Sequence, residues 1–222
     1  MKNLVIIALV FLSQLINAQV NRNLGDFDQV KVFDKINVKL IAASENKIVI
    51  SGARADEVET VNKNGELKIR MPFPQLLSGD AITVKLYFKD ITSIAASEGS
   101  YVSSETVFKQ TLLELNAKSG AEINIETDVD KVNVKASAGG IIDISGTATN
   151  QEVVITSGGI LKAIDLHTKQ TTISVAAGGK SEIYATTLVD AKVKAGGSIF
   201  VYGKPKQLNT EVFIGGTILE KN

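Results

Sequence analysis

The sequence predicts an all-β protein: a parallel β-solenoid of about 19-residue coils with glycine corners, preceded by an N-terminal β capping section. The first observation behind this prediction is that glycines return at steps of 21, 19, 19, 20, 18 and 19 residues from Gly99 to Gly215. The second is that apolar and polar residues alternate on both sides of each glycine, as in a strand with one buried face. The third is that no helical period follows these glycines.

The glycines are predicted to be architectural. Two strands that meet at a sharp corner need backbone angles that disfavour a Cβ, and each coil must stack about 4.8 Å from the next. At Gly158 and Gly178, we expect forbidden angles and a clash with the next coil to combine against a larger residue. The predicted corner residues are Gly120, Gly139, Gly140, Gly158, Gly159, Gly178, Gly179, Gly196, Gly197, Gly215 and Gly216.

The positions three and five residues before and after each reference glycine are mainly apolar, and they are the predicted core. Each coil is predicted to close through a loop, such as residues 146–151 or 203–209. A coil of this length suits two long sides or three short ones, and the sequence leaves the number open.

The first 18 residues have the layout of a secretory signal. One lysine precedes an apolar run from Leu4 to Leu12, and small or polar residues follow up to Ala18. We expect cleavage after Ala18 and no transmembrane segment after signal removal, because the run is too short for a stable membrane-spanning helix. Residues 19–93 are predicted to form the N-terminal β section and residues 94–222 the solenoid repeats. Within the former, the stretch KNGE at 63–66 predicts a two-residue hairpin turn.

Composition narrows the function classes. The chain has 24 basic and 24 acidic residues, so it lacks the basic stripe that nucleic acid requires. Because it has no cysteine, it has no disulfide, no thiolate metal site and no cysteine nucleophile. Its only histidine, His167, lies in a loop-like stretch and is predicted to be solvated. Without an aspartate that recurs in register at the corners, we expect neither calcium nor another metal or cofactor.

An outer-face column four positions after each glycine carries the best candidates for catalysis. Asp143, Lys162 and Glu182 would stack on consecutive coils there. One interpretation is an acid and base pair of a polysaccharide-active enzyme. The other is a ladder of alternating charges, which relieves the repulsion between stacked like charges. We expect the ladder and predict no catalytic residue.

The aromatic residues near the C-terminus are the candidate binding residues. Tyr184 and Tyr202 are predicted to stack on adjacent coils in one column with Ile164, beside a second column that holds Phe200 and Leu219. Exposed aromatic rows suit sugar rings or a partner surface. The alternative is that they form structural cover or a surface for self-association.

The order and spacing of several segments carry a resemblance to a known family. The chain resembles the putative auto-transporter adhesin, head GIN domain family of secreted bacterial proteins, which is found often in Bacteroidetes. The resemblance covers residues 25–222 and implies a β-helical extracellular or cell-envelope protein. This family more commonly has Ser-Gly-Ser-Gly-Asp-like corners, whereas this chain has SAGG, TSGG and AAGG. The segments are GDFDQVKV, VNKNGELKIRM, ITVKLYFKDITSIAASEGSYV, the serial glycine corners and VYGKPKQLNTEVFIGGTI.

Together these observations favour a secreted or cell-envelope β-solenoid that acts as a non-enzymatic binding or adhesion module. Its expected partner is a glycan or a cell-surface protein. The export signal leaves the final compartment open among the periplasm, the outer surface and the medium. Two other hypotheses stay open: an enzyme that acts on polysaccharide, and an envelope assembly protein that forms a homo-oligomer.

Overall fold

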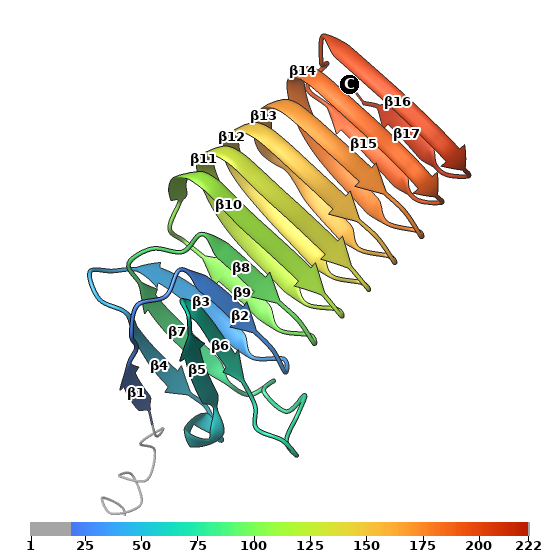
Figure 1. Cartoon of the computed structure of the whole chain (residues 1–222). Coiled ribbons are helices and arrows are strands. Elements are labelled where there is room, and N and C mark those ends of the chain that lie inside the picture. Colours follow the sequence, from blue (N-terminus) through green and yellow to red (C-terminus); the bar gives the residue numbers. More distant parts are fainter. Residues whose placement is uncertain (1–18, 222) are drawn as a thin grey trace, which may run out of the picture.

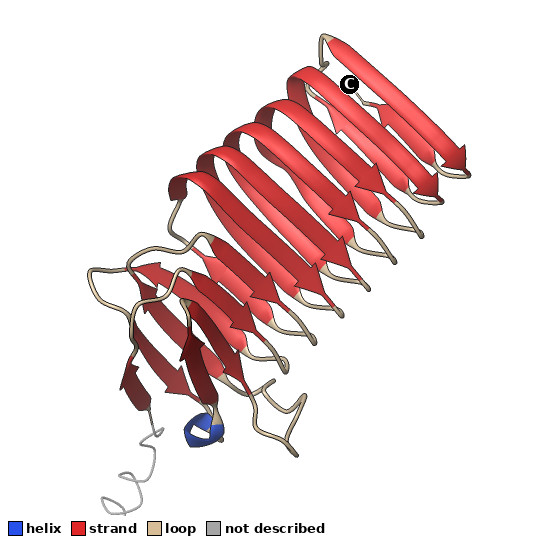
Figure 2. Cartoon of the chain, in the orientation of Figure 1, coloured by secondary structure: helices blue, strands red, loops and turns tan. Residues whose placement is uncertain are grey.

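The chain winds into a flattened parallel β-solenoid (Figure 1), which confirms the predicted fold class. The structure, a computed structural model, describes residues 19–221, so the predicted signal peptide at residues 1–18 lies outside the described residues. Across residues 19–221, strands are interrupted by a single short 3-10 helix, η1 (Ala55–Glu57), and by loops (Figure 2). The strands are β1 (Val20–Asn23), β2 (Gln29–Val32), β3 (Asn37–Ala42), β4 (Lys47–Ser51), β5 (Glu59–Lys63), β6 (Glu66–Arg70), β7 (Thr83–Phe88), β8 (Ser93–Ala96), β9 (Tyr101–Ser104), β10 (Phe108–Lys118), β11 (Glu122–Ser137), β12 (Ile141–Ile155), β13 (Ile160–Val175), β14 (Lys180–Ala195), β15 (Ser198–Tyr202), β16 (Gln207–Ile214) and β17 (Thr217–Glu220).

Each coil has two sides. The strand segments that lead into the glycine corners pair in parallel as one face, which we call the pre-corner face; it includes β2, β8, β10 and β16. The segments that leave the corners pair as the post-corner face, which includes β3, β9, β15 and β17. The long strands β11 to β14 belong to both faces, because each one leaves a corner on the post-corner face and bends over to the pre-corner face.

The edge opposite the corners, which we call the bend edge, is made of continuous strand. The predicted loop at residues 146–151 is therefore wrong: these residues lie inside β12, where Thr147 pairs with Asp128 and with His167. His167 likewise lies in β13 and not in a loop, although it is exposed as predicted. The backbone keeps its ladder pairing through the bend, so a polar run here does not end the strand. The loop predicted at residues 203–209 is present but shorter, because β16 already begins at Gln207.

The predicted glycine corners are two-residue turns in the left-handed region. At one of them Ser157 has φ 50° and Gly158 φ 72°, and the Gly158 N–H donates to the Ala177 carbonyl of the next coil. The expected clash at Gly158 and Gly178 is wrong, since an added Cβ would meet no atom within 4 Å at either position. The close approach falls on the second glycine, because a Cβ on Gly159 would lie 2.4 Å from the Ala136 carbonyl oxygen. At the corners between Gly139 and Gly179, the first glycine meets a requirement for backbone angles, and the second meets a requirement for space.

The core is a set of apolar columns between the two faces. The predicted inward positions are mostly buried in every coil except the last; for example, Ile123, Ile142 and Leu161 are each exposed by 1% or less. Ser181 occupies the same column and is fully buried, although its hydroxyl has no hydrogen-bond partner. This alignment of buried residues fixes the register, since a one-residue slip would turn the apolar set outward.

The N-terminal section contains one coil of the solenoid that lacks the glycine corner of the later coils. Strands β2 and β3 pair in parallel with β8 and β9, in register with the solenoid. The corner between them uses Asp34 and Lys35, both with positive φ, in place of glycine. The buried Asp34 carboxylate accepts hydrogen bonds from the N–H groups of Met71 and Leu77, both 3.0 Å away, and so holds the loop between β6 and β7. The predicted division at residues 93/94 stays a prediction, and the parallel register continues across it.

The N-terminal end of the solenoid is closed by antiparallel strands. β4 pairs with β7 and β1 pairs with β4 on one face, while β5 pairs with β6 on the other (Figure 1). The last pairing includes the predicted turn, with Asn64 and Gly65 both at positive φ. Arg22 on β1 joins the two faces, because its guanidinium donates to the Val58 carbonyl at 2.7 Å and to the Thr60 hydroxyl at 3.2 Å.

Candidate functional site

The outward residues of the post-corner face form the predicted column along the solenoid axis. Lys162 Nζ lies 3.8 Å from a carboxylate oxygen of Asp143, while Glu182 forms an ion pair with Lys180, with 2.9 Å between Nζ and Oε1. Asp143 and Lys162 thus form one rung of the expected ladder between coils, whereas Glu182 pairs with a lysine on its own strand. The aligned residues are Asn124, Asp143, Lys162, Glu182, Phe200 and Leu219.

Phe200 continues this column but is flanked by cations. Lys180 Nζ lies 5.5 Å from its ring centroid and Lys221 Nζ lies 5.4 Å from it, both within cation–π range. The two lysines take up space beside the ring, so Phe200 offers less free aromatic surface than its sequence position indicates. Leu219 pairs with it on the last coil and is 41% exposed.

The two tyrosines lie one coil apart, because Tyr184 of β14 pairs with Tyr202 of β15. The aromatic ring that packs against Tyr184, however, belongs to His167, whose centroid is 4.3 Å away with the ring planes tilted by 51°. Gly203 follows Tyr202 and leaves room for this ring, since a Cβ there would lie 2.9 Å from Tyr184 Cε1.

A bulge decides which residue faces Tyr184. The predicted alignment of Ile164 with Tyr184 is wrong: the register shifts between Ala163 and His167, so that His167 pairs with Tyr184. The sequence contains a trace of this bulge, because the step from Gly158 to Gly178 is 20 residues and the next step, to Gly196, is 18. His167, which the sequence predicts to be a solvated loop residue, therefore lies in a strand beside the tyrosines.

These residues surround a hollow of about 440 Å³ near the C-terminal end of the bend edge, which we call the tyrosine pocket. Ile164, although out of the predicted column, lines it together with both tyrosines, whereas Phe200 and Leu219 do not. Ring faces and an aliphatic side chain can take the C–H face of a ligand, while the histidine, the tyrosine hydroxyls and the lysines can bind its oxygens. The lining residues are Ile164, Asp165, His167, Tyr184, Tyr202, Gly203, Lys204 and Lys221.

A second hollow, of about 470 Å³, continues from the tyrosine pocket along the bend edge. The two share His167 and Tyr184, so they adjoin. We call the second hollow the bend groove. It runs from β14 back to β10 and is lined mainly by threonines, aspartates and other polar side chains. Within it the Thr147 hydroxyl donates to Asp128 at 2.7 Å. Its lining residues are Gln110, Asp128, Val129, Asp130, Thr147, Ala148, Thr149, His167, Thr168, Lys169, Tyr184 and Thr186.

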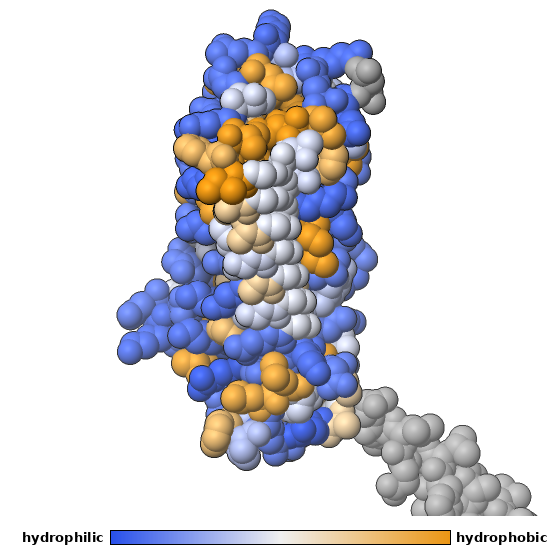
Figure 3. Space-filling view, turned by 90° about the vertical axis from the view of Figure 1, so that its right-hand side faces the viewer, coloured by the Kyte–Doolittle hydropathy of each residue, from blue (hydrophilic) through white to orange (hydrophobic). Residues whose placement is uncertain are grey.

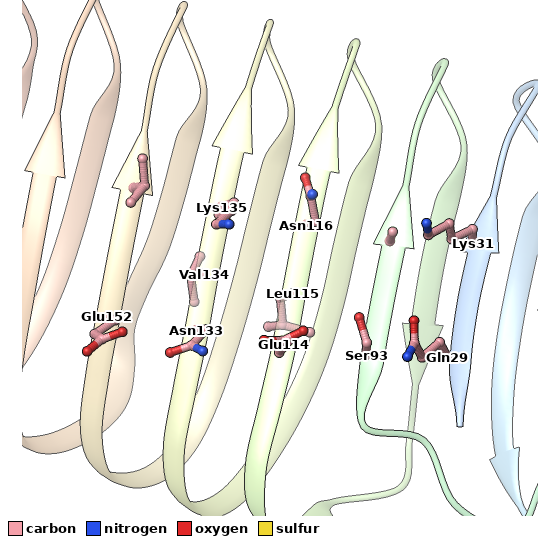
Figure 4. A pocket seen from close by; sticks show the side chains of 12 residues that line it. Gln29, Lys31, Ser93, Glu114, Leu115, Asn116, Asn133, Val134, Lys135 and Glu152 are labelled. Atoms are coloured by element: carbon pink, nitrogen blue, oxygen red, sulfur yellow. The ribbon is translucent and has the colours of Figure 1, made fainter. Parts of the chain in front are cut away.

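A third hollow, of about 400 Å³, lies on the pre-corner face over β8 (Figure 4). The small side chains of Ser93 and Ala95 make the dip, and longer side chains from neighbouring strands stand around it. Figure 4 shows Glu114, Asn133 and Glu152 in one row that crosses three neighbouring strands. The Asn133 side-chain oxygen is buried there without a hydrogen-bond partner. This groove has no aromatic lining residue, which leaves the tyrosine pocket as the stronger candidate for a binding site.

No group of three or more histidines, aspartates and glutamates is placed to hold a metal ion within residues 19–221. The clear pKa shifts lie away from the pocket. Hydrogen bonds from lysines lower the pKa of Glu45, Glu66 and Glu105, and a hydrogen bond to Glu211 raises the pKa of Lys192. Over the same described range, no helix is long and apolar enough to cross a membrane.

Comparisons with known proteins agree with the fold. The family model described as "Putative auto-transporter adhesin, head GIN domain" matches residues 26–205. No curated protein matches the sequence.

Three crystal structures share the fold at low sequence identity. A "putative adhesin" from Bacteroides fragilis has a TM-score of 0.85 at 18% identity, covering 94% of this chain and 98% of that one. A "putative adhesin" from Parabacteroides distasonis has a TM-score of 0.74 at 21% identity, covering 92% and 96%. A "putative lipid binding protein" from the same species has a TM-score of 0.72 at 16% identity, covering 94% and 98%.

Proposed function

This chain belongs to the family described as "putative auto-transporter adhesin, head GIN domain", and from that premise we propose that it is an exported, non-enzymatic binding module that holds a carbohydrate at the tyrosine pocket. The family name supports an adhesin-type role. The choice of ligand and site rests on the pocket.

The observation that carries the proposal is the cluster of Tyr184, Tyr202 and His167 around one open hollow. The two tyrosines are half-buried, so each is anchored by its own strand and still presents part of its ring. A pyranose ring has an apolar C–H face and a rim of hydroxyls, which suits a site with ring faces at its centre. Asp165, Lys204 and Lys221 at the rim supply acceptors and donors for the hydroxyls.

The bend groove favours an extended glycan over a single sugar. It prolongs the tyrosine pocket across strands β13, β12, β11 and β10, which are stacked about 4.8 Å apart. Hydroxyls and carboxylates that recur along it can bind successive sugar units. Affinity spread over several coils suits a rigid rod that attaches to a polymer surface.

The enzyme hypothesis has less support. Asp143 and Glu182 are each paired with a lysine on the post-corner face, and neither lines the tyrosine pocket. A relative named as a lipid-binding protein raises lipid as another ligand class. The hollows of this chain are open surface depressions with many polar lining groups, a setting that suits a sugar better than an acyl chain.

The predicted signal at residues 1–18 supports export to the cell envelope or out of the cell. The full chain expressed in its own type of host should yield a mature protein that begins at Gln19. Mass spectrometry of the purified protein measures this directly, and an intact Met1 would contradict export by this signal.

The binding test is a glycan array probed with purified residues 19–222, followed by affinity measurement on the best ligand. The double variant Tyr184→Ala, Tyr202→Ala should bind at least about tenfold more weakly, a change of about 1.4 kcal/mol. Tyr87→Ala is the matched control, because Tyr87 is also half-buried on an outer face but lies in β7, beside Lys47 and far from the pocket.

Each result bears on a separate part of the proposal. Equal binding by the parent and the double variant would remove the tyrosine pocket as the site. Failure of the parent to bind any glycan would overturn the carbohydrate assignment. Release of reducing ends by the parent, lost in Asp143→Asn or Glu182→Gln, would favour the enzyme instead.

A further inference from the structure

The last coil that the structure describes, β16 and β17, has an exposed core, and no other coil among residues 19–221 covers it. Val212 of β16 pairs with Val193 of the preceding coil, yet Val193 is fully buried and Val212 is 47% exposed. Within residues 19–221, β16 and β17 pair with strands on one side only, so each presents a free row of backbone N–H and C=O groups. Such edges are templates for pairing with another chain.

The last corner is also apolar on its outer surface, unlike the corner before it. Phe213 and Ile214 are 61% and 75% exposed. Ile214 pairs with Ala195, and the residue before Ala195 is Lys194, so the preceding coil carries Lys-Ala where this coil carries Phe-Ile. Figure 3 shows this apolar patch close to the C-terminal end, beside the pale strip of small residues that follows the corners. Exposed clusters of this kind mark interaction surfaces.

The shape of this end determines what covers it. Two free strand edges lie about 10 Å apart with apolar side chains between them. A single extended peptide pairs with one edge and leaves the other edge and the apolar row open. Another solenoid coil covers all three features at once, as each coil does for the one below it.

The opposite end of the molecule does not supply that coil. The edge strands there, β1 and β5, are short and mainly polar, and Arg22 ties them together through Val58 and Thr60. Head-to-tail stacking into a filament would have to break this closure. The partner with a matching open end is therefore the C-terminal end of a second copy.

We propose that two copies of this chain join through their C-terminal coils as a closed two-fold dimer. With the two-fold axis along the strand direction, β16 of one copy pairs antiparallel with β17 of the other, and the two Phe213–Ile214 corners meet. Each end face measures roughly 26 Å by 20 Å from eight residues of strand and two faces, so the contact buries on the order of 1,000 Å² in total, near the lower bound for a specific interface. Glu211 is paired with Lys192 and Glu220 adjoins Lys221, so charge does not oppose the contact.

The test measures the mass of residues 19–222 in solution by sedimentation over a range of concentrations. The parent should have twice the chain mass. The variant Phe213→Lys, Ile214→Ala gives the last coil the residue types that the preceding coil has at these positions. It should raise the dimer dissociation constant at least about tenfold. Phe73→Lys is the matched control, because Phe73 is 85% exposed on a loop of the N-terminal section and should leave the dimer intact.

A cysteine variant gives an independent readout, since the chain has no cysteine of its own. Ile214→Cys should form a disulfide-linked dimer on oxidation, whereas Val154→Cys, in the middle of the rod, should not. An interface of this size should hold the dimer together at about 100 μM, so a parent that is monomeric at that concentration would overturn the proposal. So would a dimer that persists in the Phe213 and Ile214 variant, equal cross-linking of both cysteine variants, or assembly beyond two copies.

Discussion

The Cα of Gly159 lies so close to Ala136 of the preceding coil that an added Cβ would sit 2.4 Å from the Ala136 carbonyl oxygen. The same contact recurs one coil earlier between Gly140 and Ala117, at 2.3 Å. The second glycine of each of these pairs therefore sets how closely the corners stack. The first glycine has open space around its Cβ position, so glycine is favoured there only because φ is positive.

The two glycines of one corner should consequently differ in their tolerance of alanine. Gly159→Ala forces backbone to move and should lower the free energy of unfolding by about 3 kcal/mol or more. Gly158→Ala, which must only adopt a positive φ, should cost about 1–2 kcal/mol. Urea unfolding of the two variants measures both values, and each serves as the other's control. Equal losses would show that the close approach to Ala136 relaxes freely.

The residue before the first glycine offers a stabilising change. Ala177 has φ 50° and is exposed, and asparagine tolerates this conformation better than alanine does. Ala177→Asn should raise the free energy of unfolding by roughly 0.5–1 kcal/mol, since Asn-Gly is the preferred pair for such turns. Ala195→Asn is the control, because Ala195 precedes Gly196 but is not among the residues with positive φ. An equal gain at both sites would mean that backbone angle is not the cause.

Ser181 and Thr127 are both fully buried, and they differ in whether the hydroxyl is bonded. The Thr127 hydroxyl donates to the Phe108 carbonyl at 3.2 Å, whereas the Ser181 hydroxyl has no partner. Ser181→Ala should therefore be neutral or stabilising by up to about 1 kcal/mol, and Thr127→Val should destabilise by about 1 kcal/mol. Thermal unfolding of the pair decides this. A marked loss on Ser181→Ala would show that the hydroxyl has a partner in solution.

Removal of Arg22 should open the N-terminal end. Its guanidinium donates hydrogen bonds to Val58, to Thr60 of β5 and, at 3.4 Å, to the Asp56 carbonyl, so Arg22→Ala should cost about 1–2 kcal/mol. Amide exchange should accelerate in β1 and β4 and stay unchanged in β12. Arg70→Ala is the control, because Arg70 makes an exposed ion pair with Glu59 and should change stability by less than about 1 kcal/mol. Unchanged exchange in β1 would contradict a closing role for Arg22.

The pH dependence of stability should be a plateau with losses at both extremes. Glu66 has its pKa lowered from 4.5 chiefly by its hydrogen bond with Lys31 and next by that with Lys68, while the hydrogen bond to Glu211 raises the pKa of Lys192 from 10.5. A lowered carboxyl pKa contributes stability above about pH 4.5 that is lost as pH falls through the folded-state value. A raised lysine pKa contributes stability that is lost as pH rises through its own folded-state value. Glu66→Gln should flatten the acid limb measured by unfolding between pH 3 and pH 5, and an unchanged limb would exclude this pair as a source.

Much of the fold follows from the sequence alone. The glycine steps and the alternating apolar columns determined a parallel solenoid, its buried positions and the stacking of Asp143, Lys162 and Glu182, because inward side chains and sharp corners constrain each coil locally. The same local reasoning located the turn at Asn64 and Gly65. What these features share is that their cause lies within a few residues of themselves.

Tertiary structure decided the rest. An early corner forms without glycine, because Asp34 and Lys35 adopt positive φ there. Residues 146–151 stay in a strand, and His167 rather than Ile164 lies opposite Tyr184. Each of these outcomes depends on pairing with strands about 20 to 65 residues away, whose ladder hydrogen bonds outweigh local preference. The exposure of the last coil likewise depends on its neighbours and not on its residue types. Val212 is as apolar as the Val193 with which it pairs, yet Val193 is buried and Val212 is exposed.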